Sequence, residues 1–189
     1  MTGGNAGFRP QLEARLNVTG SNWVAYAVGH YSEIDLSGVD GATPTPIEKT
    51  IKSNAFALGG TFKPGPWNLK GFVFTGKGLG QNFGALSQFG DISETGGYAQ
   101  LGYSFTKNWN VNAIYATDRP DKDDVLRWRG TAVGLLRNDQ TALNLIYANG
   151  PYKFGLEAMH DSLDRTADKG ATTDTISGNQ VSVSAQYTF

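Results

Sequence analysis

The clearest pattern of polar and apolar positions lies in the last ten residues of the chain. From Gln180 to Phe189, apolar side chains alternate without exception with polar ones. A period of two is typical of a β-strand that has one apolar and one polar face. The pattern therefore predicts a strand that runs to the aromatic Phe189, with no polar tail after it.

The same alternation predicts eight more strands. They cover residues 10–19, 23–33, 54–63, 67–75, 98–106, 109–117, 137–148 and 152–160. Most have the nine to eleven residues that a tilted strand needs to cross a bilayer. With the last segment they make about nine antiparallel strands, and the chain is expected to be all-β, as a single domain over residues 1–189.

Aromatic residues recur beside short turns at an even interval. Trp23, Trp67, Trp109 and Tyr152 each follow a short polar or Gly/Pro-containing turn, at steps of 44, 42 and 43 residues. Such a period indicates one repeated unit, here a hairpin with a short turn at one end and a long loop at the other. Propeller blades have a similar period but need four strands each. The asymmetry is that of a transmembrane β-barrel, with aromatic rings at the membrane interface.

Composition agrees with a barrel. The mean hydropathy of -0.34 is too polar for a bundle of membrane helices. Four tryptophans, eight tyrosines, ten phenylalanines and 25 glycines suit twisted strands with lipid-facing rings. The net charge of -1 gives no indication of a nucleic-acid partner. The absence of cysteine excludes thiolate metal sites and disulfides. No signal peptide is recognisable at the start of the chain.

An odd number of strands raises the question of closure. Bacterial single-chain barrels close with an even number, and open sheet edges are costly in hydrocarbon. We therefore expect the chain to be the C-terminal part of a larger barrel whose N-terminal strands are absent. The alternative is a complete barrel of about eight or ten strands, with one segment miscounted in the stretch 125–136.

Several strand segments resemble the C-terminal halves of large bacterial outer-membrane porins. They are residues 56–62, 69–80, 97–103, 143–147 and 154–157, and the final aromatic strand resembles the closing strand of such barrels. The resemblance implies a water-filled pore in the bacterial outer membrane, often in a homotrimer, in contact with membrane lipids and lipopolysaccharide. It implies passive diffusion of small hydrophilic solutes, without cofactor and without covalent chemistry.

Charged residues on the polar face of the predicted strands are the candidate pore lining, because charges facing lipid would be costly. They are listed together with one amide: Glu13, Arg15, Lys70, Gln100, Lys153 and Glu157. We interpret them as a mixed-charge lumen that tunes permeation. The alternative is an internal salt-bridge network that plugs a small barrel.

Three expected loop segments carry residues that could bind a ligand or an ion. Residues 76–85 are glycine-rich but lack the ending of a phosphate loop, and they could fold against the barrel wall. Residues 118–124 cluster carboxylates without the spacing of a calcium loop, so a solvated turn is expected rather than a metal site. Arg127 and Arg129 flank Trp128 in an expected loop, where they could bind anionic groups or pair with the nearby aspartates.

His160 and Ser162 form the one enzyme-like arrangement. Both fall on the apolar face of the predicted strand. They resemble the His-x-Ser motif of outer-membrane lipid A deacylases, with Asp164 and Asp174 as possible acids. The Asn that usually follows the serine in that motif is Leu163 here. A polar strand end is the alternative interpretation, and the chain is expected not to be an enzyme. A non-conducting structural barrel remains a third possibility.

Overall fold

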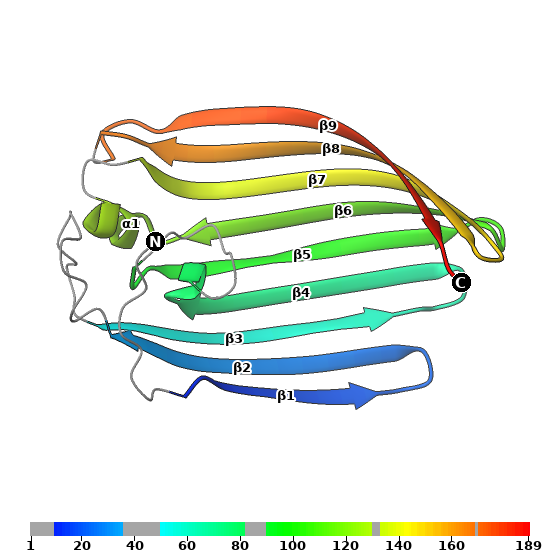
Figure 1. Ribbon diagram of the computed structural model, residues 1–189, viewed down its shortest axis with the longest axis horizontal. Coiled ribbons are helices and arrows are strands. Elements are labelled where there is room, and N and C mark those ends of the chain that lie inside the picture. The colour runs from blue at the N-terminus through cyan, green and yellow to red at the C-terminus, as the bar shows by residue number, and fades with distance from the viewer. Residues whose placement is uncertain (1–9, 36–49, 82–89, 130–132, 169) are drawn as a thin grey trace.

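The computed structural model describes residues 10–35, 50–81, 90–129, 133–168 and 170–189, and these form one nine-stranded antiparallel sheet. The strands follow one another in chain order, each paired with the next (Figure 1). Their bounds are β1 Leu12–Thr19, β2 Trp23–Asp35, β3 Thr50–Phe62, β4 Trp67–Lys77, β5 Ser93–Ser104, β6 Trp109–Pro120, β7 Gly134–Asn149, β8 Tyr152–Thr166 and β9 Asp174–Tyr187. The predicted all-β antiparallel class and the number of strands are confirmed.

Short turns lie at one end of the sheet, and the long connections lie at the other (Figure 1). The strands start and stop close to the predicted positions at the turn end, but most extend further than predicted at the loop end. For example, β8 continues to Thr166 and β9 begins at Asp174. Alternation weakens in these extensions because the apolar face becomes polar there, so periodicity did not reveal them.

One α-helix interrupts the strand pattern. Residues Lys122–Arg129 form α1, where the sequence suggested a loop, and Leu79–Gln81 form a short 3₁₀ turn, η1. Asp121 starts α1 by accepting a hydrogen bond from the backbone N–H of Asp124 at 3.0 Å, which is the standard N-terminal cap. The rest of the glycine-rich segment, from residue 82, lies outside the described residues. No helix in the described ranges is long and apolar enough to cross a membrane.

The two faces of the sheet differ in how crowded they are. Polar side chains such as Ser53 and Asn112 are buried on the polar face, at 1% and 3% exposure. On the opposite face Val73 and Val183 are 60% and 81% exposed. Because the sheet is a single layer, crowding on one face and openness on the other indicate that it curls around the polar face. We call these the concave and the convex face.

The sheet has two edges. Among the described strands, β1 pairs only with β2 and β9 pairs only with β8. With nine antiparallel strands, β1 and β9 run in the same direction. Each leaves a row of backbone groups without a strand partner in this sheet, which is the feature that the sequence analysis expected from an odd number of strands.

The β7–β8 turn depends on a glycine with a left-handed backbone. Gly150 has a φ of 56°, and nothing lies within 4 Å of where a Cβ would be. Glycine is therefore favoured there because of the backbone conformation and not because a side chain would lack room. At Gly29, on the convex face of β2, no atom lies within 4 Å of where a Cβ would be, and the backbone is that of an ordinary strand.

We expect Gly150→Ala to lower the free energy of unfolding by about 1 kcal/mol, because a Cβ is strained at positive φ. Urea unfolding of the protein in lipid vesicles would measure the change. Gly29→Ala is the matched control and should be neutral or slightly stabilising, since it only reduces the entropy of the unfolded chain. Equal destabilisation by both variants would contradict the backbone explanation.

Candidate functional site

All six candidate pore residues lie on the concave face. On β1, Glu13 pairs with His30 and Arg15 pairs with Val28 of β2. Towards the other edge of the sheet, Glu157 on β8 pairs with Ser182 of β9. Lys70 pairs directly with Gln100 across β4 and β5, and Lys153 pairs with Gln186. One face of one sheet thus brings together residues that are up to 144 positions apart. Their role as a pore lining remains a prediction.

A chain of side-chain amides crosses the concave face from β5 to β8. Asn112 is its centre: its Oδ1 accepts from Gln100 Nε2 at 3.0 Å, and its Nδ2 donates to Asn144 Oδ1 at 2.7 Å. Asn144 Nδ2 in turn donates to Glu157 Oε2 at 3.3 Å. Asn112 and Asn144 each both donate and accept, which holds the row in one arrangement. Of these amides, only Gln100 was predicted from the sequence as a candidate pore residue.

Arg15 and Glu13 are held by groups other than an oppositely charged Asp, Glu, Lys or Arg among the described residues. The Arg15 guanidinium lies 4.3 Å above the Tyr26 ring, a cation–π contact, and its Nε donates to Asn17. Glu13 Oε1 lies 3.2 Å from His30 Nδ1. Neither Lys70 nor Lys153 forms an ion pair with another described residue. In the described part of the chain, this arrangement favours a mixed-charge wall over a salt-bridge network.

Four aromatic rings form a cluster on the concave face that the sequence analysis did not predict, because it assigned the rings to the lipid side. Tyr26, Phe72, Phe74 and Tyr98 come from β2, β4 and β5. The centroid of Phe72 lies 6.4 Å from Tyr26, 5.9 Å from Phe74 and 6.3 Å from Tyr98. Alternation in the sequence could have predicted this placement, since all four residues occupy positions on the polar face of their strands.

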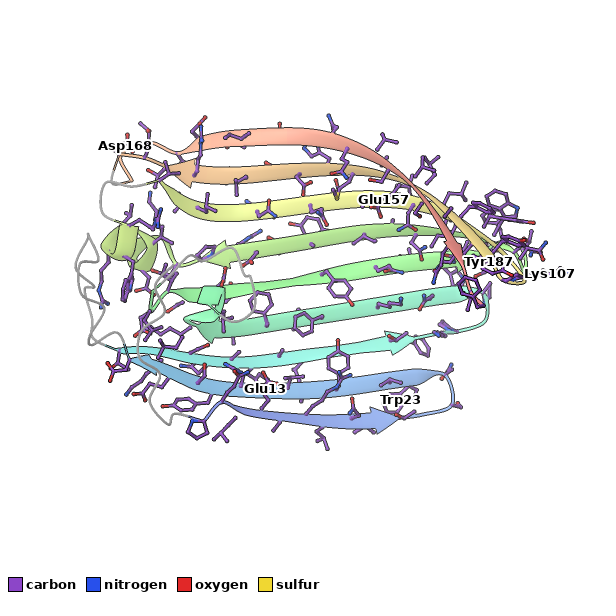
Figure 2. The ribbon with its side chains drawn as sticks, viewed as in Figure 1. Glu13, Trp23, Lys107, Glu157, Asp168 and Tyr187 are labelled. Atoms are coloured by element: carbon purple, nitrogen blue, oxygen red, sulfur yellow. The ribbon has the colours of Figure 1, made fainter. Side chains whose placement is uncertain are left out.

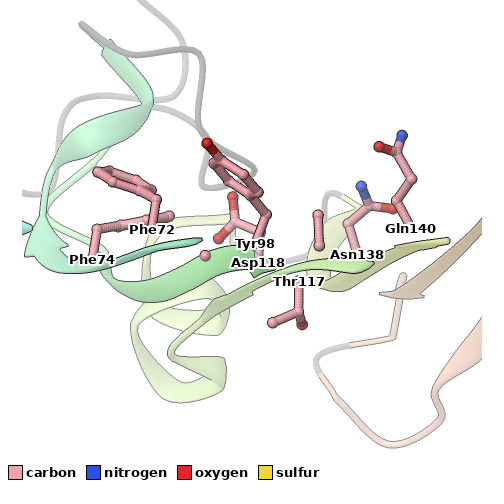
Figure 3. A pocket seen from close by; sticks show the side chains of 9 residues that line it. Phe72, Phe74, Tyr98, Thr117, Asp118, Asn138 and Gln140 are labelled. Atoms are coloured by element: carbon pink, nitrogen blue, oxygen red, sulfur yellow. The ribbon is translucent and has the colours of Figure 1, made fainter. Parts of the chain in front are cut away.

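A hollow of about 380 Å³ opens beside these rings (Figure 3). Besides Phe72, Phe74 and Tyr98, its lining includes Asp118, Asn138 and Gln140 from β6 and β7. The Gln140 amide is held by donating to Asp161 Oδ1 at 2.9 Å. The hollow therefore combines an aromatic wall on one side with carboxylate and amide groups on the other.

The convex face is apolar and carries an aromatic belt at the turn end, where Trp23 and Tyr187 lie (Figure 2). Trp67 pairs with Tyr103, Trp109 with Tyr147 and Tyr152 with Tyr187, at centroid distances of 4.6, 4.9 and 5.2 Å. The periodic aromatics of the sequence are thus the first residues of β2, β4, β6 and β8, and all share this face.

The apolar band of the convex face has a definite height. From Trp23 to Tyr31 along β2, every second residue is apolar or glycine, a distance of about 26 Å at the usual rise per residue. Beyond it the same face becomes polar, at Asn54, Thr117 and Asn179. Because the strands of transmembrane barrels tilt by about 35–45°, this length corresponds to a band about 20 Å high, and nine residues is about what a tilted strand needs to cross a bilayer. A belt of aromatic rings at the boundary is typical of such a band.

The predicted loop arginines belong to α1 instead of a loop. Arg129 donates from Nε to the Val133 carbonyl at 3.1 Å, and Arg127 also has a partner. Asp124 accepts a hydrogen bond from the Ser93 N–H at 2.9 Å, which fastens the helix to β5. The carboxylates of this segment thus cap and anchor α1. No described group of three or more metal-ligating side chains comes together here or elsewhere.

His160 and Ser162 lie inside β8 on the convex face, not at a strand end as the alternative interpretation assumed. His160 Nδ1 contacts the amide oxygen of Asn179 at 2.8 Å. Of the two possible acids, Asp174 lies on the concave face and pairs with Arg165, and Asp164 accepts from the Thr175 hydroxyl at 2.7 Å. Neither Asp164 nor Asp174 therefore contacts the histidine, and the described residues do not form the triad geometry of a hydrolase with either acid.

The comparisons with known proteins give one informative likeness. No family model matches the chain, and no curated protein matches it. The crystal structure of the outer membrane channel DcaP of Acinetobacter baumannii is similar, with a TM-score of 0.73 at 17% sequence identity. The similarity covers 95% of this chain and 51% of that chain, so this chain spans about half the length of the channel. At this identity the likeness shows a shared fold.

Asp168 organises the connection between β8 and β9 at the loop end. It accepts hydrogen bonds from the Thr172 hydroxyl at 2.6 Å, from the Thr172 N–H at 2.9 Å and from the Thr166 hydroxyl at 3.0 Å. These donors, with the Thr172 hydroxyl first, lower the pKa of the Asp168 carboxyl below its usual value.

We expect the Asp168 contacts to stabilise the loop fully above the ordinary aspartate pKa and to be lost as the pH falls through the lowered pKa. A pH titration of the Asp168 carboxyl carbon by NMR should show the lowered midpoint. In Thr172→Val, which removes the hydroxyl donor, the midpoint should rise towards the normal value. An unchanged midpoint in this variant would contradict the assigned cause.

Asn112→Ala should lower the free energy of unfolding by about 1–3 kcal/mol, because it leaves the amides of Gln100 and Asn144 without their buried partner. Urea unfolding in lipid vesicles would measure the loss. Gln180→Ala is the control: the Gln180 side chain is exposed on the same face, and among the described residues it bonds to Ser182 alone, so its removal should have little effect. Equal effects at the two positions would show that the amide row contributes no stability.

Proposed function

We propose that this chain forms part of the wall of a bacterial outer-membrane channel that lets small hydrophilic solutes diffuse passively. The observation that carries the proposal is the division of one curved sheet into a convex apolar face with an aromatic belt and a concave polar face with charges. A globular protein would cover an apolar face with a second layer. Here the apolar face is suited to contact lipid, and the polar face is suited to contact water.

The fold likeness to an outer membrane channel supports the same proposal. This chain corresponds to about half of that channel's length. Because β1 and β9 run in the same direction, an all-antiparallel barrel requires an odd number of further strands between them. We propose that additional strands complete the barrel, and that assembly into a homotrimer, implied by the porin resemblance, follows closure.

Selectivity would come from the charges on the concave face. Lys70 and Lys153 carry charges that no described acidic group neutralises, whereas Glu13 contacts His30 and Glu157 accepts from Asn144. Charges along a wet wall attract counter-ions and change the ratio of permeating anions to cations. A change of charge at either lysine is therefore expected to alter the ion preference of the channel most directly.

The first test is single-channel conductance of the protein, at its full natural length, in a planar lipid bilayer. Discrete ohmic steps are expected, because a barrel of this kind encloses water. A protein that inserts into the bilayer and never conducts would overturn the proposal and leave a structural barrel as the function.

Lys70→Glu should shift the preference of the channel towards cations, seen as a change in reversal potential across a gradient of KCl. The shift should be largest at low salt, since screening shortens the reach of the charge to about 10 Å at 0.1 M. Lys107→Glu is the matched control: Lys107 lies in the short β5–β6 turn, outside the sheet (Figure 2). Equal shifts in both variants would contradict a selectivity role for the concave face.

A further inference from the structure

A second hollow, of about 340 Å³, lies on the concave face of β8 near the turn end of the sheet. Lys153, Gly155 and Glu157 line it, on alternate positions of the same strand. Side chains of the two neighbouring strands complete the wall, among them Asn144 from β7 and Ser182 and Ser184 from β9. We call it the β8 hollow. It has a basic side chain at one end and an acidic side chain at the other.

These two charges do not neutralise each other. Four residues of extended strand separate the Cα atoms of Lys153 and Glu157 by about 13 Å. None of the ion pairs among the described residues joins them or includes either one. The Glu157 carboxylate accepts from Asn144 Nδ2 at 3.3 Å, and this uncharged partner leaves its negative charge in place. Lys153 is exposed on the concave face. An ammonium and a carboxylate are therefore both available to a solute in this hollow.

Gly155 keeps the space between the two charges open. A Cβ at this position would lie only 2.7 Å from Ser184 Oγ, so the glycine lets this hydroxyl lie close to the floor of the hollow. Ser184 pairs with Gly155 across the two strands, and Ser182 pairs with Glu157. Hydroxyls can both donate and accept hydrogen bonds. The β9 side of the hollow thus offers neutral polar groups between its charged ends.

We propose that the β8 hollow binds a short zwitterionic peptide, of about two residues, as a permeating solute. The terminal carboxylate pairs with Lys153, the terminal ammonium pairs with Glu157, and the amide group between them bonds to the β9 hydroxyls. An extended dipeptide is about 7 Å long. With a charge-assisted hydrogen bond of about 2.8 Å at each end, it matches the separation of about 13 Å between the two strand positions. This inference rests on the proposed channel function, for which it names a class of solute.

The same arrangement discriminates against solutes with a single charge. An anion bound along the hollow would pair with Lys153 but would place no cation at Glu157, and a cation would leave Lys153 without a counter-charge. Each would gain one favourable contact and would meet a like charge at the other end. A zwitterion of matching length gains both contacts.

Binding can be measured without conduction, so the two proposals can fail separately. In saturation-transfer NMR titrations of the full-length protein in detergent micelles, glycylglycine is the probe. It should bind at least about threefold more tightly than N-acetylglycylglycine, which lacks the ammonium, and than glycylglycinamide, which lacks the carboxylate. Equal affinities, or tighter binding of either singly charged analogue, would overturn the proposed ligand class even if the protein conducts. Selective binding by a protein that never conducts would support the site and remove only its role in permeation.

Variants test whether these two residues form the site. Lys153→Gln and Glu157→Gln should each weaken glycylglycine binding at least about threefold. Glu157→Gln keeps an oxygen that can accept from Asn144, so the sheet should fold normally. Lys107→Gln removes an exposed lysine of the β5–β6 turn, outside the hollow, and is the matched control. Unchanged binding in Lys153→Gln, or an equal loss in Lys107→Gln, would overturn the assigned site.

A double variant that exchanges the charges, Lys153→Glu with Glu157→Lys, gives a further test. A dipeptide can bind in the reversed direction, so this variant should recover glycylglycine binding to within about twofold of the original protein. Circular dichroism would show that the sheet is intact. Failure to recover binding in a folded double variant would show that the pair of opposite charges does not hold the peptide.

Discussion

Hydrogen bonding between neighbouring strands is the interaction on which the rest of this structure depends. Each pair of neighbouring strands satisfies the backbone groups that face each other, and the nine strands follow in chain order as a meander. A backbone paired in this way can lie in hydrocarbon at no electrostatic cost, whereas an unpaired group costs several kcal/mol. The same requirement makes β1 and β9, each of which pairs with only one described strand, the positions at which we propose further strands.

The strand ladder also creates the division between the two faces. Because side chains alternate, every residue of one parity is directed to the same side throughout the sheet. Apolar residues and the aromatic belt occupy the convex face, and charges, amides and four rings occupy the concave face. The proposed channel therefore depends on this geometric property, and a slip of a single residue in register would exchange lipid and water contacts.

The sequence predicted the strands and their faces well, because alternation and the turn aromatics are local signals. It placed Lys70, Glu157 and the other four candidates on one face, and it placed Trp23 and its equivalents beside the short turns. It was wrong about α1, where the local pattern is charged and the helix is held by the Asp121 cap and by contacts with β5 and β7. It also ended β8 too early, since the strand continues where the convex face is no longer apolar.

By itself, the sequence determined the antiparallel β class, the number of strands and the two-faced pattern, because these follow from periodicity along the chain. Only the tertiary structure decided which residues of different strands meet: Asn112 with Gln100 and Asn144, or Phe72 with Tyr26 and Tyr98. Periodicity assigns a residue to a face but not to a height on it. Register between strands sets that height, and register is a property of the paired sheet rather than of any single segment.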